Sequence, residues 1–389
     1  MRDQELLFGL DYFLQQADKF SHLRFALATN DSSTTRHGRL GRIALIEKGF
    51  RLTKLFSPEH GLTGQGVDGA FQNNVADPVT GLPVISLYGH HLKPLKEDLS
   101  DIDAVLFDVP DVGCRFYTYL WTMTYLMEAC AQFRKTLFIL DRPNPSSGNL
   151  DLAEGPMLDE TNCSSFIGRW SIPARHSCTC GELAAYFAAT RIEHLDLQII
   201  NVQNWERNQC VIKPTWLFIP PSPAITDPET AFLYPGTGLL EGINVNEGRG
   251  TTSPFKVFGA PWINASQIHD AFEDLHLPGI KTKPYSYTPT SGLYQSAMCH
   301  GLELTVSDPF VFRPVQAGLK LIQLITSIYP GYCTERLYKT IANPTGRNHL
   351  DKLTGVFQSF SKIKSDQLEG SSPVVSRWEY VMKPFLFYK

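Results

Sequence analysis

The stretch Leu55-Phe-Ser-Pro-Glu-His-Gly61 joins the end of an apolar run, residues 52–56, to a polar turn. The run predicts a buried β-strand, and Pro58 and Gly61 predict the turn that ends it. In an open α/β sheet, ligands bind just beyond the carboxyl ends of the strands. Glu59 and His60 stand at such a position, so we take them as candidates for proton transfer. The structural alternative is a turn in which Glu59 caps a following helix.

Apolar runs alternate with helical patterns on both sides of this stretch. Further strands are predicted at 24–30, 82–88, 104–109, 136–141 and 197–202, and helices at 4–20, 40–49, 94–99, 116–133 and 181–190. Strands that alternate with helices form a parallel sheet covered on both faces. We therefore predict an α/β protein in which residues 1–205 form a Rossmann-like catalytic domain.

The pattern changes after residue 205. Pro220-Pro-Ser-Pro223 predicts a rigid, extended connection. Beyond it we expect a loop over 236–252, helices at 265–276 and 314–328, and a half-buried strand at 302–307. Residues 206–389 are thus predicted to form a smaller α+β domain.

Composition and charge exclude several classes of partner. The chain has 389 residues, 43% of them hydrophobic and 19% charged, which is ordinary for a globular protein of two domains. The net charge of −4 and the absence of a basic block argue against a nucleic-acid partner. No apolar run reaches the length of a membrane span. The eight cysteines are scattered and no export signal is visible, so we expect reduced thiols and a cytoplasmic location, unless a signal has been removed.

Cofactor and metal motifs are weak. Gly64-Gln-Gly-Val-Asp-Gly69 matches G-x-G-x-x-G, but it does not join a strand directly to a helix, so no nucleotide cofactor is predicted. His176-Ser-Cys-Thr-Cys180 lacks the second cysteine pair that a structural zinc site requires, and no metal is predicted. His90-His91 is interpreted as a surface or site-lining pair. His176 alone either lines the site or satisfies a hydrogen bond in the core.

Two polar stretches are candidates to complete a site with Glu59. Asp111-Val-Gly-Cys-Arg-Phe-Tyr-Thr-Tyr119 follows a strand and opens a helix. Its Asp and Arg can bracket a ligand and its tyrosines can stack on a sugar, or all four can serve only to fix the loop and the core. Glu241-Gly-Ile-Asn-Val-Asn-Glu-Gly-Arg-Gly-Thr-Thr252 is either an ordinary surface loop or a loop that closes over the strand ends of the first domain.

Motifs spread in order along most of the chain resemble those of the exo-acting β-N-acetylmuramidases of the NamZ type. They include Phe56-Ser-Pro-Glu-His-Gly61, Asp108-Val-Pro-Asp-Val-Gly-Cys-Arg-Phe-Tyr-Thr-Tyr119, Leu140-Asp-Arg-Pro-Asn-Pro145 and Asn246-Glu-Gly-Arg-Gly-Thr-Thr252. The resemblance implies an active site in the cleft between the two domains. It also implies a bacterial glycosidase that releases N-acetylmuramic acid from the non-reducing end of peptidoglycan fragments, in cell-wall turnover and recycling. A non-catalytic muropeptide- or sugar-binding protein on the same fold is the alternative.

Glycoside cleavage requires an acid for the leaving oxygen and a group that stabilises an oxocarbenium-like transition state. We predict Glu59 as the acid, with His60 orienting it, and Asp111 or Glu247 as the second carboxylate. The 2-acetamido group of the substrate is an alternative nucleophile. The stereochemical course and the oligomeric state are not predicted.

Recognition of the substrate requires further polar groups. The lactyl carboxylate of muramic acid requires a cation, for which the candidates are Arg115, Arg142 and Arg249. The other predicted substrate-binding residues are Tyr117, Asn144, His176 and Asn246. The stretch Asp68-Gly-Ala-Phe71 departs from the family pattern close to the predicted site. The resemblance therefore does not define the details of the substrate.

Overall fold

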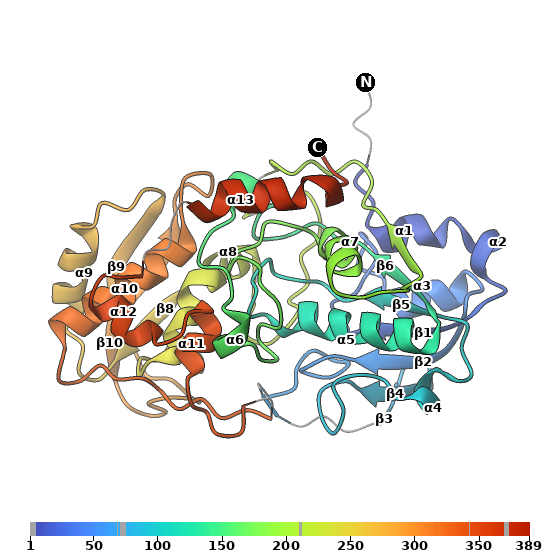
Figure 1. Cartoon of the computed structure of the whole chain (residues 1–389). Coiled ribbons are helices and arrows are strands. Elements are labelled where there is room, and N and C mark those ends of the chain that lie inside the picture. The colour runs from blue at the N-terminus through green and yellow to red at the C-terminus, as the bar shows by residue number, and fades with distance from the viewer. Residues whose placement is uncertain (1–4, 68, 71–74, 210–211, 342, 369–372) are drawn as a thin grey trace.

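The computed structural model describes residues 5–67, 69–70, 75–209, 212–341, 343–368 and 373–389. Within these residues the strands form a seven-stranded sheet and a three-stranded sheet, which lie in opposite halves of the molecule (Figure 1). The predicted α/β class is confirmed. Among the same residues, no helix is both long and apolar enough to cross a membrane.

The larger sheet has the strand order β3-β4-β2-β1-β5-β6-β7. Its strands are β1 (Arg24–Thr29), β2 (Arg51–Ser57), β3 (Val75–Ala76), β4 (Pro83–Ser86), β5 (Ala104–Asp108), β6 (Thr136–Leu140) and β7 (Leu197–Ile200). All neighbours pair in parallel except β3 and β4, which pair antiparallel. The six parallel strands follow the 3-2-1-4-5-6 order of doubly wound dinucleotide-binding folds. The carboxyl ends of β2 and β5 therefore point to the same edge.

Helices cover both faces of this sheet, because side chains of successive strand residues point to opposite faces. Ala26 and Ala28 of β1 face the core beneath α5 (Thr118–Phe133) and α7 (Cys180–Thr190). Phe25 and Leu27 face the core beneath α1 (Gly9–Leu14) and α3 (Gly41–Glu47). The single helix expected over residues 4–20 is instead two, α1 and α2 (Ala17–Phe20). The remaining helices of this half are α4 (Lys96–Leu99), η1 (Leu150–Leu152) and α6 (Glu160–Cys163).

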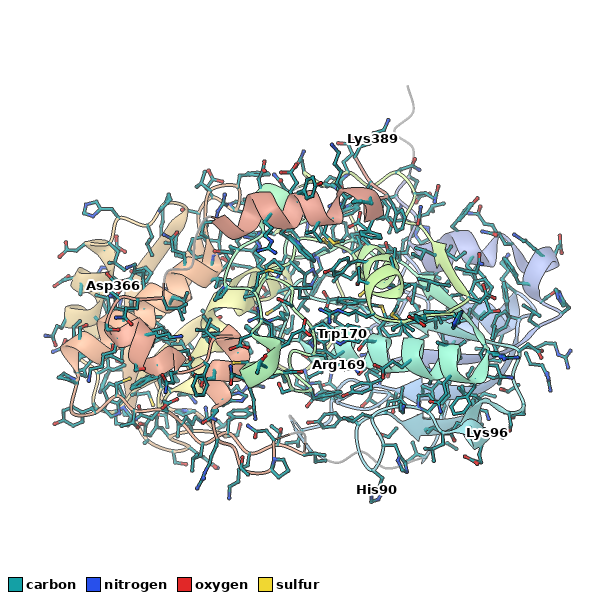
Figure 2. The ribbon with its side chains drawn as sticks, viewed as in Figure 1. His90, Lys96, Arg169, Trp170, Asp366 and Lys389 are labelled. Atoms are coloured by element: carbon teal, nitrogen blue, oxygen red, sulfur yellow. The ribbon has the colours of Figure 1, made fainter. Side chains whose placement is uncertain are left out.

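Arg169 and Trp170 cover the outer side of α5 (Figure 2). The guanidinium carbon of Arg169 lies 3.8 Å from the ring centroid of Tyr125, and its Nη2 lies 2.5 Å from a carboxylate oxygen of Glu128. The Arg169 side chain, held between the Tyr125 ring and the Glu128 carboxylate, covers this part of the helix surface. α5 is therefore a firm support for the residues at its first turn.

The second half is built on the antiparallel sheet β8-β10-β9. Its elements are α8 (Pro228–Thr237), η2 (Gly238–Gly242), β8 (Val257–Ala260), α9 (Ala265–Glu273), β9 (Ile280–Tyr287), β10 (Cys299–Val306), α10 (Pro314–Ile328), α11 (His349–Thr354), α12 (Ser359–Lys364), α13 (Pro373–Met382) and η3 (Lys383–Phe385). The loop expected over 236–252 begins inside helical structure. Asp227 caps α8 by accepting a hydrogen bond from the backbone N–H of Thr230, and Pro228 suits the first helical position.

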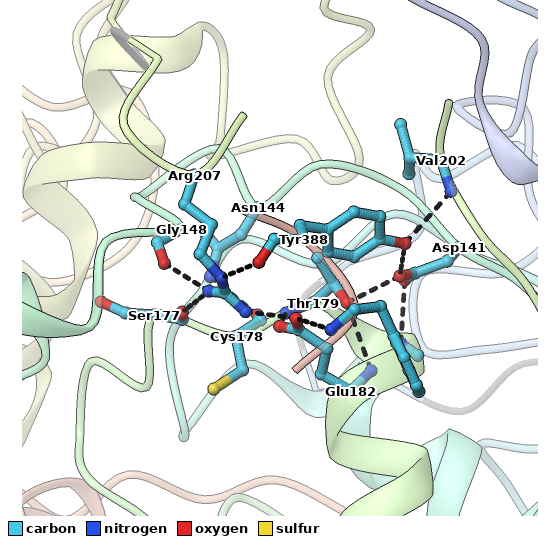
Figure 3. A network of polar contacts seen from close by, with 12 residues as sticks. Asp141, Asn144, Gly148, Ser177, Cys178, Thr179, Glu182, Val202, Arg207 and Tyr388 are labelled. Carbon is cyan, nitrogen blue, oxygen red and sulfur yellow. Dashed lines mark hydrogen bonds and ion pairs between the residues drawn. The ribbon is translucent and has the colours of Figure 1, made fainter. Parts of the chain in front are cut away.

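The end of the chain returns to the first half, where α13 approaches α7 (Figure 1). The Tyr388 hydroxyl donates to Asp141 at 2.5 Å and accepts from the backbone N–H of Val202 at 3.1 Å (Figure 3). Next to them, Arg207 forms a buried ion pair with Glu182. Burial raises the pKa of Asp141 to about 6. The last residues thus fasten the second half of the chain to the large sheet.

Candidate active site

A cleft of about 760 Å³, partly open to solvent, lies beyond the carboxyl ends of β2 and β4 and the start of α5. Residues from both halves of the chain line it. Its aromatic wall consists of Tyr88, Phe116, Tyr117, Phe166, Tyr234, Phe255 and Tyr338. Its ionisable side chains are Glu59, His60, Glu241, Arg249, His349 and Lys352, besides the tyrosines. The structure therefore brings Glu59, His60, Tyr117 and Arg249 together, as the sequence predicts.

Glu59 lies just past the end of β2 and is only 6% exposed. Its two carboxylate oxygens accept separate hydrogen bonds. The Thr118 hydroxyl donates to Oε2 at 2.7 Å, and the backbone N–H of Gly69 donates to Oε1 at 3.0 Å. Thr118 is the first residue of α5, so the positive end of that helix faces the carboxylate. The carboxyl group is held in one orientation toward the cleft.

His60 is the residue at which the chain turns away from β2. Its φ of +68° lies in the left-handed region, which is uncommon for residues other than glycine. Two hydrogen bonds to Gly66 hold it there: the Gly66 N–H donates to the His60 carbonyl at 2.9 Å, and His60 Nδ1 lies 2.8 Å from the Gly66 carbonyl oxygen. Because a carbonyl only accepts, Nδ1 carries a hydrogen in this arrangement. The ring is thus fixed next to Glu59.

The second half of the chain contributes another carboxylate to the cleft, Glu241 on η2. Arg249 donates to Glu241 Oε1 from Nη2 at 2.7 Å and from Nε at 3.1 Å. Glu247, which the sequence analysis proposed for this role, lies behind Arg249 and is not among the lining residues. It is 1% exposed and pairs with Arg249 at 3.2 Å and Arg336 at 3.1 Å. The structure therefore favours Glu241 over Glu247.

Helix α11 supplies the third side of the cleft. Tyr338 stacks on His349, with ring centroids 4.5 Å apart and planes 9° apart. Lys352 and Leu353 follow on the same helix and also line the cleft. Arg115 Nη2 donates to the Leu353 carbonyl at 3.0 Å, which ties α11 to the first half of the chain.

The surroundings of Arg115 contradict its predicted role as a cation that binds the substrate. It is completely buried, and its Nη1 also donates to the carbonyls of Pro156 at 2.6 Å and Ile172 at 2.8 Å. Burial lowers its pKa to about 10. Its hydrogen bonds go to the backbone of both halves of the chain, and it is not among the residues that line the cleft.

Asp111, Arg142 and Asn144 gather at a separate cavity of about 280 Å³, beyond β5 and β6. His176 Nε2 lies 3.2 Å from Asp111 Oδ2. Arg142 binds Asp108 through Nε at 2.6 Å and Nη2 at 3.0 Å. The strand ends do converge on one edge, but the edge holds two cavities, and these four residues do not line the cleft that contains Glu59.

Asn144 and Asn246, two of the predicted binding residues, form hydrogen bonds that support loops. The Asn144 amide donates to the Cys178 carbonyl at 2.9 Å and accepts from the Ser146 N–H at 2.8 Å. Asn246 is fully buried; its oxygen accepts from the Gly248 N–H and the Tyr287 hydroxyl, both at 2.8 Å. In both turns the side-chain oxygen accepts a hydrogen bond from a backbone N–H group two residues further along the chain. Neither contacts the cleft.

The weak motifs have ordinary surroundings. Among the residues that the structure describes, no cluster of His, Cys, Asp and Glu is suited to a metal ion, and Cys178 and Cys180 are buried free thiols. His90 is exposed at the periphery (Figure 2). Gly64 and Gly69 lie in turns between β2 and β3. The departure Asp68-Gly-Ala-Phe71 begins and ends at residues outside the described part of the chain.

The cleft residues absent from the predicted site include Thr118, Glu241 and Lys352. Thr118 stands between Tyr117 and Tyr119, and Glu241 opens the same polar run as Glu247, so both lie in stretches with a functional signal in the sequence. Lys352 lies in no motif, so only its position in the fold reveals it.

Glu59 and Glu241 are both buried and both line this aromatic-walled cleft. Glycoside hydrolases use such a pair of carboxylates, since one serves as acid and the other stabilises or attacks the sugar. The fold and the cleft together place the chain in that class of enzyme.

Comparison with known proteins identifies the family. The chain matches two family models, described as exo-beta-N-acetylmuramidase NamZ, N-terminal, over residues 25–229, and C-terminal, over residues 232–388. It is 40% identical over 324 residues to peptidoglycan beta-N-acetylmuramidase NamZ of Bacillus subtilis (strain 168), spanning 83% of this chain and 78% of that protein. The chain belongs to the NamZ exo-β-N-acetylmuramidase family.

Solved structures agree with the fold. Crystal structures of two DUF1343 family proteins from Bacteroides fragilis NCTC 9343 superpose with TM-scores of 0.84 and 0.75. Their sequences are 28% and 26% identical to this chain, and the alignments cover 100% and 99% of both chains, respectively. The two-domain arrangement is therefore shared over the whole length of these relatives.

Proposed function

We propose that this protein is an exo-acting glycosidase that hydrolyses the β-1,4 bond after a terminal N-acetylmuramic acid of peptidoglycan fragments, with Glu59 as the general acid. The observation that carries the proposal is the placement of Glu59 and Glu241 in one cleft. The two family models that match the chain are described as exo-beta-N-acetylmuramidase, which supports cleavage from an end.

The surroundings of Glu59 suit a group that changes its protonation state during the reaction. The Thr118 hydroxyl, 2.7 Å away, can donate to the carboxylate and can accept from the carboxylic acid. The acid can therefore give its proton to the leaving oxygen without losing its orientation.

We propose Glu241 as the second carboxylate. Its ion pair with Arg249 fixes its direction, as is required of a group that opposes an oxocarbenium-like transition state. In this role Glu241 either attacks the sugar, activates water, or orients the 2-acetamido group as the internal nucleophile. The aromatic residues Tyr117 and Tyr234, whose ring centroids are 6.0 Å apart, form an apolar wall for the sugar ring.

The test is incubation of wild type and Glu59→Gln with N-acetylmuramyl-β-1,4-N-acetylglucosamine, with free sugars followed by mass spectrometry. Glutamine keeps an acceptor for the Gly69 N–H, and its amide can donate to the Thr118 hydroxyl, so the cleft is expected to keep its shape. We expect both monosaccharides from wild type and a turnover about 10²- to 10⁴-fold lower in the variant, the usual contribution of general acid catalysis.

Each contrary outcome has a separate meaning. Near-normal turnover by Glu59→Gln would remove Glu59 from the acid role. Binding of the disaccharide without hydrolysis by wild type would instead favour the non-catalytic sugar-binding protein.

A further inference from the structure

Lys352 is a cation in the wall of the cleft that contains Glu59 and Glu241. It is half-buried on α11, and this burial lowers the pKa of its ammonium group. Among the residues that the structure describes, no Asp or Glu forms an ion pair with Lys352. A half-desolvated ammonium without a counter-ion gains free energy when an anion binds beside it.

The other cation of the cleft wall, Arg249, is in a different situation. Glu241 and Glu247 both contact its guanidinium, at 2.7 and 3.2 Å. Arg336 pairs with the other oxygen of Glu247, so the four groups carry two positive and two negative charges. Arg249 is therefore already neutralised by the protein, whereas the charge of Lys352 is not.

The position of Lys352 is fixed by contacts from both halves of the chain. The Arg115 guanidinium donates to the Leu353 carbonyl, and α11 ends at Gly355, whose φ is +74°. A Cβ atom at Gly355 would lie 2.5 Å from Arg115 Nη2, so only glycine allows this close approach. On its other side α11 packs against η2, where Leu350 contacts Gly242 next to Glu241. A cation on such a support holds its place relative to both carboxylates.

We propose that Lys352 binds the lactyl carboxylate of the terminal N-acetylmuramic acid and so determines the preference for muramic acid over N-acetylglucosamine. This inference rests on the proposed function. Muramic acid differs from glucosamine by the 3-O-lactyl group, whose carboxylate is the anionic group of the sugar. The ammonium of Lys352 forms a charge-assisted hydrogen bond with it, and Arg249 holds Glu241 in place.

The test compares two substrates that differ in one charge: N-acetylmuramyl-β-1,4-N-acetylglucosamine and the same disaccharide with its lactyl carboxylate converted to the primary amide. The kcat/KM of each is measured for wild type, Lys352→Met, Lys352→Arg and Arg249→Met. Lys364→Met is the matched control, because Lys364 is an exposed lysine at the end of α12. Thermal unfolding of each variant verifies that it folds.

We expect Lys352→Met to lose about 10- to 100-fold on the acid and little on the amide, as is usual when a hydrogen bond between charged groups is removed. Lys352→Arg should retain part of the preference for the acid, and Lys364→Met all of it. An equal loss on both substrates, or no loss on the acid, would overturn the assignment. Loss of the preference in Arg249→Met but not in Lys352→Met would transfer the role to Arg249.

Calorimetric binding of free N-acetylmuramic acid and N-acetylglucosamine separates this inference from the proposed reaction. A wild type that prefers muramic acid through Lys352 but cleaves no disaccharide would contradict the hydrolytic function and support the role of Lys352. A wild type that cleaves the disaccharide but binds both sugars equally would do the opposite.

Discussion

Replacing Arg115 with methionine is expected to lower the free energy of unfolding by about 3 kcal/mol. The guanidinium donates to the carbonyls of Pro156, Ile172 and Leu353. Without it, three buried acceptors lose their partner, at about 2 kcal/mol each, or about 6 kcal/mol together. Against this, the variant no longer buries a charge. Burial lowers the pKa of Arg115 from 12.5 to about 10, which corresponds to about 3 kcal/mol regained.

Urea unfolding curves of wild type and Arg115→Met, followed by tryptophan fluorescence, measure this difference. Arg51→Met is the control, because Arg51 is exposed at the start of β2 and its replacement is expected to change stability by less than about 0.5 kcal/mol. If Arg115→Met unfolded at the urea concentration of wild type and yet lost affinity for N-acetylmuramic acid, the bracing role would be refuted. The interpretation of Arg115 as a substrate ligand would then stand.

Two further predictions follow from the geometry. Glu241→Gln is expected to lower kcat on the muramyl disaccharide by about 100-fold or more, while Asp111→Asn leaves kcat near wild type; the reverse order would return Asp111 to the active site. Burial raises the pKa of Asp141 to about 6, above its ordinary 3.8, so its contribution to stability is complete below pH 3.8 and is lost as the pH rises through 6. Between pH 3.8 and 6, the free energy of unfolding of wild type should therefore fall relative to that of Asp141→Asn by up to about 3 kcal/mol. Unfolding measured as a function of pH tests this, and a difference between the two proteins that does not change with pH would contradict the assignment.

The positions of the strands could be predicted from the sequence because burial on both faces requires a continuous apolar run. A strand covered on both faces is apolar throughout, so the runs at 24–30, 52–56 and 104–109 stand out against the polar turns that follow them. The connection between them is also constrained, since parallel strands joined by helices form a doubly wound sheet. The edge at which Glu59 and His60 lie follows from this order.

The sequence did not predict which polar residues line the same cavity. Asp111 and Glu59 both follow strands of one sheet, yet they line different cavities. Glu241 and Glu247 differ by six positions in one polar run, and backbone turns there place one at the cleft and the other behind Arg249. Such choices depend on contacts between segments that are far apart in the chain, for which the local sequence carries no signal.

Arg115 and Lys352 illustrate the division between the two kinds of information. The sequence by itself determined the fold class, the family and the strand end that carries Glu59, because each depends on local patterns of burial and on motifs. It marked Arg115 as a cation of interest and passed over Lys352. Only the tertiary structure decided that the first is enclosed by carbonyls while the second faces the cleft, because burial and charge compensation are properties of the surroundings that folding brings together.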